Sequence, residues 1–224
     1  MKKTFSLLLM LLSVPLAVIL GLTVFADRSF AYLSLLISII AIGAFLLTFE
    51  KKETNARKMI IISVMCVLSI AGRLIFGIIP GFKPVTAIIV ILSIHFGSEA
   101  GFLCGALTAL ISNFYFGQGP WTPYQMLAWG LIGLIAGLIA PILKKSLICT
   151  CIYGALSGVV FSLIMDIQTL TWNSNEVELS LYISKIASSL PFTVLYALSN
   201  VVFLLILSRP ISKKITRLKI KYGI

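Results

Sequence analysis

Charged side chains are scarce in this sequence, and acidic ones are scarcest. Of 224 residues, 11% are charged, 7 are acidic and 1 is histidine, whereas 59% are hydrophobic and the mean hydropathy is +1.10. A soluble domain carries about a quarter charged residues and about half apolar ones. The composition therefore indicates an integral membrane protein. Eight spans of about 20 residues would take about 160 residues, so we expect no extramembrane domain among these residues.

The sequence also lacks the motifs of several catalytic and metal-binding classes. There is no GxxxxGK[ST] string, so we do not expect the chain to hydrolyse ATP itself. The string nearest to the GxSG of a serine hydrolase, residues 155–158, reads ALSG and lacks the first glycine. Cysteines without CxxC spacing, inside apolar runs, favour packing over a disulfide or zinc site; they are Cys66, Cys104, Cys149 and Cys151. We expect no enzymatic activity, no cofactor and no metal.

Apolar runs between charges and helix breakers predict an all-α membrane fold with about eight transmembrane helices. We divide the chain into an N-terminal two-helix hairpin over 1–56, a six-helix core over 57–210 and a basic tail over 211–224. The segment 84–97 is short, and Pro80, Gly81 and Pro84 predict a structured turn before it. The expected spans are 4–26, 29–49, 58–79, 84–97, 99–116, 123–143, 146–166 and 181–208.

The basic residues indicate the orientation of these spans. Lys and Arg outnumber Asp and Glu by 18 to 7, and 14 of the 18 fall on one side of the predicted topology. Basic residues collect on the cytoplasmic side of membrane proteins. We therefore expect both termini in the cytoplasm of a bacterium, with the basic tail against anionic lipid or a partner and no role in nucleic-acid binding. An alternative treats 1–26 as a cleaved signal peptide, which leaves the other spans oriented as before.

Small residues recur at helix-packing spacing within the predicted core. Such rows let helix backbones approach closely in lipid. In the last span, Asn200 and Pro191 are expected to serve helix packing and a kink. The rows are Gly101, Gly105 and Ala109; Gly133, Gly137 and Pro141; and Gly154 and Gly158.

Polar and aromatic side chains gather on the predicted outer side, most densely in the turn FGQGPWTPYQ. Rigid turns with flanking aromatics are typical of a small-molecule pocket, although an interfacial aromatic belt would look similar. A charge inside a span needs compensation, so Arg73 is expected to reach the surface, to pair with Asp166 or to contact a ligand. The candidate substrate-binding residues are Arg73, Lys83, Asn113, Tyr115, Gln118, Trp121, Tyr124, Gln125, Trp129, Asp166, Gln168, Trp172 and Asn173.

Residues 57–210 resemble the substrate-binding (S) component of energy-coupling factor (ECF) vitamin transporters. The resemblance rests on six spans, on the turn RLIFGIIPGFKPVTA and on the stretch GFLCGALTALISNFYFGQGPWTPYQMLAWGLIG. It implies a six-helix bundle that captures a vitamin from outside, with a transmembrane coupling protein and a pair of cytoplasmic ATPases as partners. It also implies that small residues of the first core helix contact the coupling protein, although the AxxxA pattern common in this family is absent. The corresponding residues here are Ser63, Cys66, Ser69 and Gly72.

The ligand class is less sharply indicated than the family. The GQGPWTP turn is most similar to S components for cobalamin or related corrinoids, while riboflavin, a queuosine precursor or another planar vitamin would suit the same side chains. Two other functions stay open. A self-sufficient secondary permease would use His95 and Glu99 for protons, and a structural membrane protein would use its outer aromatics only as anchors.

Overall fold

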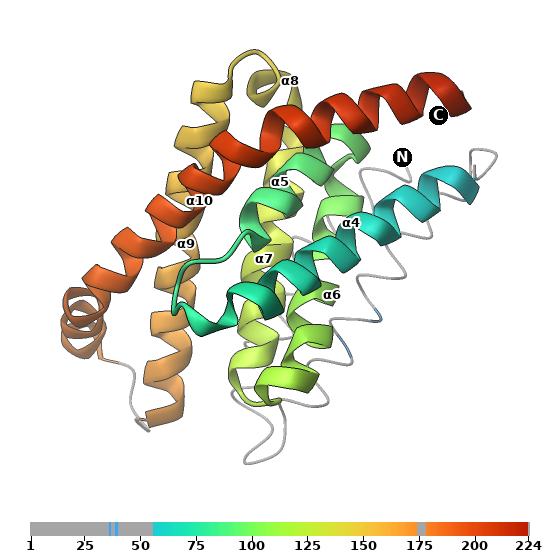
Figure 1. Cartoon of the computed structure of the whole chain (residues 1–224). Coiled ribbons are helices and arrows are strands. Elements are labelled where there is room, and N and C mark those ends of the chain that lie inside the picture. Colours follow the sequence, from blue (N-terminus) through green and yellow to red (C-terminus); the bar gives the residue numbers. More distant parts are fainter. Residues whose placement is uncertain (1–35, 37–38, 40–55, 174–177, 224) are drawn as a thin grey trace, which may run out of the picture.

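The structure is a computed structural model that describes residues 36, 39, 56–173 and 178–223. The predicted hairpin over 1–56 therefore lies almost wholly outside the described residues. Within the described part of the chain, every regular element is helical, as predicted (Figure 1). In chain order the elements are α4 (Ala56–Ile75), the short 3-10 helix η2 (Phe76–Ile78), α5 (Val85–Phe96), α6 (Ser98–Phe116), α7 (Trp121–Leu138), α8 (Ala140–Leu143), α9 (Leu147–Asn173) and α10 (Leu179–Tyr222).

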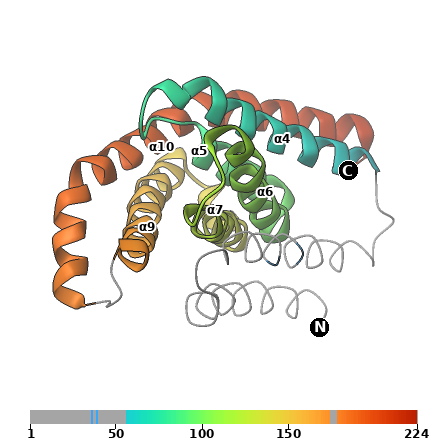
Figure 2. The same cartoon turned by 90° about the horizontal axis from the view of Figure 1, so that it is seen from below.

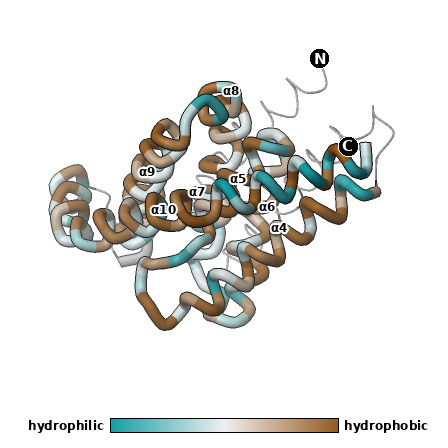
Figure 3. Tube along the Cα trace, turned by 45° about the horizontal axis from the view of Figure 1, so that its top comes forward, coloured by the Kyte–Doolittle hydropathy of each residue, from teal (hydrophilic) through white to brown (hydrophobic). Residues whose placement is uncertain are grey.

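Several of these helices have the length and composition of membrane spans. Four are long and apolar enough to cross a bilayer, namely those over Ala56–Ile78, Ser98–Phe116, Leu147–Leu170 and Leu179–Tyr222. The short span predicted over 84–97 is the 12-residue helix α5, about 18 Å long. Figure 3 shows hydrophobic residues along most of the helices and hydrophilic ones gathered near the end of α10. The chain is thus an all-α membrane protein.

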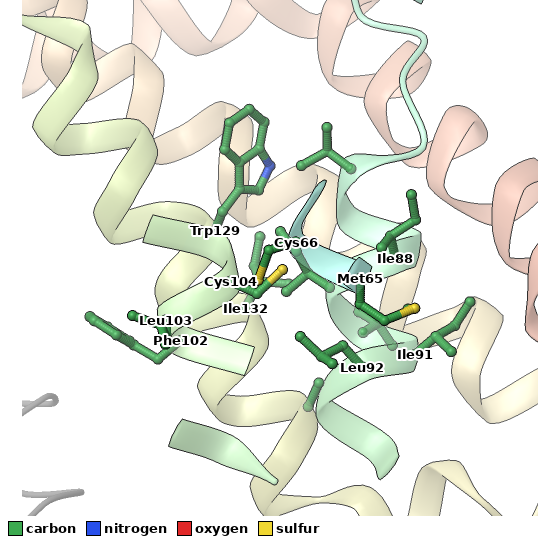
Figure 4. Close-up of a cluster of buried hydrophobic side chains, with 14 of the residues drawn as sticks. Met65, Cys66, Ile88, Ile91, Leu92, Phe102, Leu103, Cys104, Trp129 and Ile132 are labelled. Atoms are coloured by element: carbon green, nitrogen blue, oxygen red, sulfur yellow. The ribbon is translucent and has the colours of Figure 1, made fainter. Parts of the chain in front are cut away.

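The helix α5 is the centre of the packed core. It contacts α4, α6, α7, α9 and α10, and nearly all of its side chains are buried. Figure 4 shows Ile88, Ile91 and Leu92 of α5 meeting Met65 of α4 and Cys104 of α6. A helix enclosed in this way needs no polar face, which explains its nearly uniform apolar sequence.

Two pairs of helices approach through the predicted rows of small residues. A Cβ atom added at Gly101 would lie 2.6 Å from the carbonyl oxygen of Gly133, and one at Gly158 would lie 2.6 Å from the backbone nitrogen of Ala197. The α6–α7 and α9–α10 backbones are therefore too close to admit a side chain at these positions. The prediction of close helix packing is confirmed, and Asn200 adds a hydrogen bond across α9–α10, from Nδ2 to the carbonyl oxygen of Gly154 (2.9 Å).

The helix α10 is longer than the span predicted over 181–208. Its 44 residues extend about 66 Å, contain Pro191 and Pro210, and change direction along their course (Figure 2). Residues of the predicted basic tail continue this helix to Tyr222. There, Lys219 Nζ donates to the carbonyl oxygen of His95 (2.6 Å), and Ile215 is buried. The basic end of α10 therefore lies across the end of the bundle at which α5 finishes.

Candidate ligand-binding site

A cavity of about 80 Å³ lies at the opposite end of α5, between the loop that precedes this helix and the helices α7, α9 and α10. Four of the predicted substrate-binding residues line it: Arg73, Lys83, Gln125 and Trp129. The other lining residues are Gly81, Val85, Thr86, Gly158, Phe161, Tyr196 and Asn200.

The loop over residues 79–84 forms one side of the cavity and is fastened to α10. Ser199 Oγ accepts a hydrogen bond from the backbone nitrogen of Lys83 (2.9 Å) and donates one to its carbonyl oxygen (3.2 Å). Gly81 has a φ of +76° and lies against Leu195, where an added Cβ would be 2.9 Å from Cδ2 of that leucine. Only glycine adopts this conformation without strain in so small a space. The structured turn predicted from the glycine and prolines is therefore present.

Arg73 crosses from the last turn of α4 to α6 and α7. Its Nη1 donates to Ser112 Oγ and to Asn113 Oδ1 (2.9 Å), and its Nη2 donates to Gln125 Oε1 (3.0 Å). Arg73 is only 4% exposed, so it does not extend to the membrane surface. Its partners are neutral oxygens, and among the described residues no carboxylate pairs with it. Of the three possibilities raised by the sequence, contact with a ligand is the one left open.

A second layer of hydrogen bonds holds these partners in place. Asn113 Nδ2 donates to Thr122 Oγ1 (2.9 Å) and to Gln125 Oε1 (3.0 Å), and Thr122 Oγ1 donates to Gln118 Oε1 (2.9 Å). Gln118 Nε2 in turn donates to the carbonyl oxygen of Leu110 (2.9 Å). Since buried polar groups without partners are costly, this network fixes both the arginine and the amide of Gln125.

Three aromatic rings from three helices form the apolar wall. The rings of Trp129 and Phe161 stack with centroids 5.0 Å apart at 20°, and the ring of Tyr196 meets Phe161 edge-on at 5.3 Å. The Arg73 guanidinium lies 4.9 Å from the Trp129 ring centroid and 5.0 Å from that of Phe116. A cation over aromatic faces beside an apolar wall suits a ligand that has both a flat ring and polar groups.

A second positive charge, that of Lys83, also lines the cavity. Lys83 Nζ lies 5.5 Å from the Phe116 ring centroid, on the ring that Arg73 also contacts. Burial, and secondarily the charge of Arg73, lower the pKa of Lys83 from its ordinary 10.5 to about 8. None of the lining residues within the described part of the chain is acidic.

Comparison with known families identifies the family to which the chain belongs. Residues 53–217 match the model of the family described as "ECF-type riboflavin transporter, S component". The chain belongs to this family. The resemblance to ECF S components inferred from the sequence is thereby confirmed, while the matched family is described by riboflavin rather than by cobalamin.

More distant similarity extends to UPF0397 proteins, over about 41–42% of this chain. The UPF0397 protein of Aliivibrio salmonicida is 33% identical over 97 residues, that of Aliivibrio fischeri 32% over 98, and that of Vibrio atlanticus 29% over 99. The matched regions make up 51%, 52% and 53% of those proteins, so the chain spans about half the length of the curated relatives that it matches. No solved structure matches the chain.

The other predicted residues of this S component lie around the cavity or away from it. Asn113 and Gln118 belong to the network behind Arg73. Tyr115 is 76% exposed, and Trp121 donates from Nε1 to the carbonyl oxygen of Gly117 (3.3 Å) at the surface. Tyr124 is buried in the hydrophobic core. None of these five side chains lines the cavity.

The predicted residues of α9 form two groups, one buried away from the cavity and one whose side chains lie outside the described ones. Asp166 is buried and accepts a hydrogen bond from Ser189 Oγ (2.6 Å) of α10, whereas the hydrogen-bond partners of Arg73 are Ser112, Asn113 and Gln125. Gln168 is buried and does not line the cavity. Trp172 and Asn173 form the end of α9, but their side chains lie outside the described ones.

The residues predicted to contact a coupling protein face in two directions. Cys66 and Ser69 are buried, and an added Cβ at Gly72 would lie 2.5 Å from Pro84 Cγ, so these three residues face the interior of the bundle. Ser63 is exposed, between the exposed side chains of Ile60 and Val64. Within the described part of the chain, α4 therefore has an exposed, largely apolar face around Ser63.

Proposed function

We propose that this protein is the substrate-specificity subunit of an ECF-type importer, and that it binds a vitamin in the cavity beside Arg73 and Trp129. The observation that carries the proposal is the combination of a buried cation, fixed amides and an aromatic wall around one hollow. Family membership supports the same role. With basic residues on the cytoplasmic side, this end of the bundle faces outward.

The ligand is a planar vitamin, with a flavin as the first candidate. The family description names riboflavin, and its flat ring matches an aromatic wall made by Trp129, Phe161 and Tyr196. The cavity of about 80 Å³ is small beside the roughly 300–1,000 Å³ typical of ligand pockets. A corrinoid macrocycle, the candidate favoured by the sequence, would need far more space. Entry of even a flavin requires the loop over residues 79–84 to move.

Energy is supplied by partner chains in this proposal. A transmembrane coupling protein contacts the apolar face of α4 around Ser63, and cytoplasmic ATPases drive release of the vitamin inward. The absence of a phosphate-binding loop from the sequence supports this division of labour.

The proposal is tested by uptake of labelled riboflavin and labelled cobalamin into cells that lack their own transporters. We expect riboflavin uptake only when the coupling protein and ATPases are coexpressed, because this chain carries no ATPase of its own. Trp129→Ala should abolish uptake, whereas Trp121→Ala, at a surface tryptophan outside the cavity, should not. Uptake without ATPases, driven by a proton gradient, would indicate a secondary permease. No binding of any vitamin by the folded protein would favour a structural role.

A further inference from the structure

The cavity carries two positive charges that the described residues do not balance. Arg73 and Lys83 both line it, and none of the described residues that line it is acidic. Three carboxylates lie in the described part of the chain, outside the residues that line the cavity. Each accepts a hydrogen bond from a serine hydroxyl: Asp166 from Ser189, Glu99 from Ser98 and Glu178 from Ser180. The hollow is therefore electropositive.

Of the two cations, Arg73 carries the larger free-energy cost of burying a charge. It is 4% exposed, and the neutral oxygens that accept from its two terminal nitrogens satisfy hydrogen bonds without cancelling charge. Among the described residues, its buried Nε has no hydrogen-bond partner. A buried cation without a counter-ion is unfavourable even over aromatic rings. A buried arginine without a counter-ion, next to a cavity, is well placed to bind an anion.

Lys83 supplies the second charge to the same place. The hydrogen bonds between Ser199 Oγ and both backbone groups of Lys83 hold the loop. The Lys83 ammonium group approaches the Phe116 ring that Arg73 also contacts. Two like charges at one ring repel each other. A single anionic group between them converts this repulsion into two attractive interactions.

Gln125 adds a neutral donor. Arg73 Nη2 can only donate, so the oxygen of the Gln125 amide must face it, and that oxygen also accepts from Asn113 Nδ2. The Nε2 group of Gln125 therefore points its hydrogens away from this network, and Gln125 lines the cavity. Arginine, lysine and amide donors together form a set that suits carboxylate or phosphate oxygens.

We propose that the ligand of this transporter carries an anionic oxygen group, a carboxylate or a phosphate, which binds between Arg73 and Lys83 while its ring lies against Trp129 and Phe161. The inference rests on the proposed function, because it assigns a chemical class to the ligand of the same cavity. It distinguishes vitamins that are charged at neutral pH from neutral ones of the same shape.

A matched pair of probes tests the charge alone. Riboflavin and riboflavin 5′-phosphate share one ring system and differ by the phosphate. We expect the purified full-length protein to bind the phosphorylated flavin at least about tenfold more tightly, the size expected of charge-assisted hydrogen bonds. Lys83→Gln should remove most of this difference, and Lys185→Gln, which changes a cation of α10 that does not line the cavity, should keep it. Equal or tighter binding of the neutral flavin would overturn the proposal.

A second measurement needs no flavin. In neutral detergent, sodium phosphate should raise the thermal midpoint of the wild type and of Lys185→Gln more than sodium chloride of equal ionic strength does. Without phosphate, Lys83→Gln should unfold at the same temperature as the wild type or higher, because it removes a repelled cation, and phosphate should not stabilise it selectively. Absence of selective stabilisation of the wild type would overturn the anion site.

The two measurements separate the anion site from the transport function. ATPase-dependent uptake with a preference for neutral riboflavin would refute the anion site and leave the transport function standing. Phosphate stabilisation that depends on Lys83, without ATPase-dependent vitamin uptake, would support the anion site but refute the transport function. If phosphatidylglycerol added to the micelles binds at the site and displaces the phosphorylated flavin, the occupant is a lipid headgroup and the vitamin assignment is wrong.

Discussion

Replacement of Gly158 by alanine tests the packing that forms the floor of the cavity. Gly158 of α9 lines the cavity and faces the backbone of α10 beside Tyr196, another lining residue. An added Cβ would lie 2.6 Å from the backbone nitrogen of Ala197 and 2.8 Å from the carbonyl carbon of Tyr196. Ordinary contact begins at 3.4 Å, so the helices must separate by several tenths of an ångström. Backbone atoms cannot rotate away as a side chain does.

The expected cost follows from two opposing effects. Overpacking of this kind costs about 1–3 kcal/mol, while replacing glycine by alanine inside a helix gains about 1 kcal/mol. Gly154→Ala, one turn earlier on α9, is the matched control because its nearest neighbour is the end of the flexible Leu204 side chain. Gly154→Ala should therefore gain the same helix stability from alanine, with a smaller steric cost. The two variants should therefore differ by about 1–3 kcal/mol in the free energy of unfolding.

The assay is thermal unfolding in mild detergent, together with ligand binding. At about 2–4 °C per kcal/mol for a chain of this size, Gly158→Ala should unfold several degrees below Gly154→Ala. It should also bind the ligand more weakly, because separation of α9 from α10 moves Tyr196 away from Phe161. A midpoint for Gly158→Ala at or above that of Gly154→Ala, with unchanged affinity, would refute the close α9–α10 contact and the cavity built on it.

Three further predictions concern charge, a buried carboxylate and the partner surface. Because the pKa of Lys83 is about 8, its ammonium is charged below pH 8 and lost above it. Affinity for riboflavin 5′-phosphate should thus fall between pH 7 and 9, toward the affinity of Lys83→Gln, although Arg73 stays charged; a pH-independent affinity would contradict this. Asp166→Leu, which removes the acceptor of Ser189, should cost about 1 kcal/mol in thermal unfolding but leave affinity near wild type; a loss of binding without unfolding would show that this carboxylate acts on the ligand. Ser63→Trp on α4 should leave ligand binding intact and block uptake with the partners, whereas Leu190→Trp, at an exposed position of α10, should block neither; normal uptake by Ser63→Trp would move the coupling surface elsewhere.

The sequence predicted the limits of α5 well because both ends carry backbone signals. Pro84 stands immediately before the helix, and Gly97 after it has a φ of +99°. The end of α9 was harder to predict. Asp166 and Gln168 resemble the polar edge of a span, but α9 continues to Asn173. A serine on α10 satisfies the Asp166 carboxylate inside the bundle, and that contact is not visible in the local sequence.

That Arg73 lines the cavity could be expected for a different reason. A charge within an apolar helix demands compensation wherever the helix lies, so its position alone marks it as unusual. Phe161 and Tyr196 carry no such signal, because an aromatic residue in an apolar helix has the same appearance whether it packs in the core, faces lipid or lines a cavity. Only the approach of α9 to α10 at Gly158 brings these rings beside Trp129.

Tyr115 and Phe116 show why composition locates a site but does not select its residues. Tyr115 was among the predicted binding residues and Phe116 was not, although both lie at the end of α6. Successive helical residues point about 100° apart, and here Phe116 lies under Arg73 and Lys83 while Tyr115 is 76% exposed. The choice between them depends on the rotation of α6 about its axis. That rotation is fixed by buried residues such as Asn113, whose Oδ1 accepts from Arg73, and so by contacts between helices rather than by the order of residues along one.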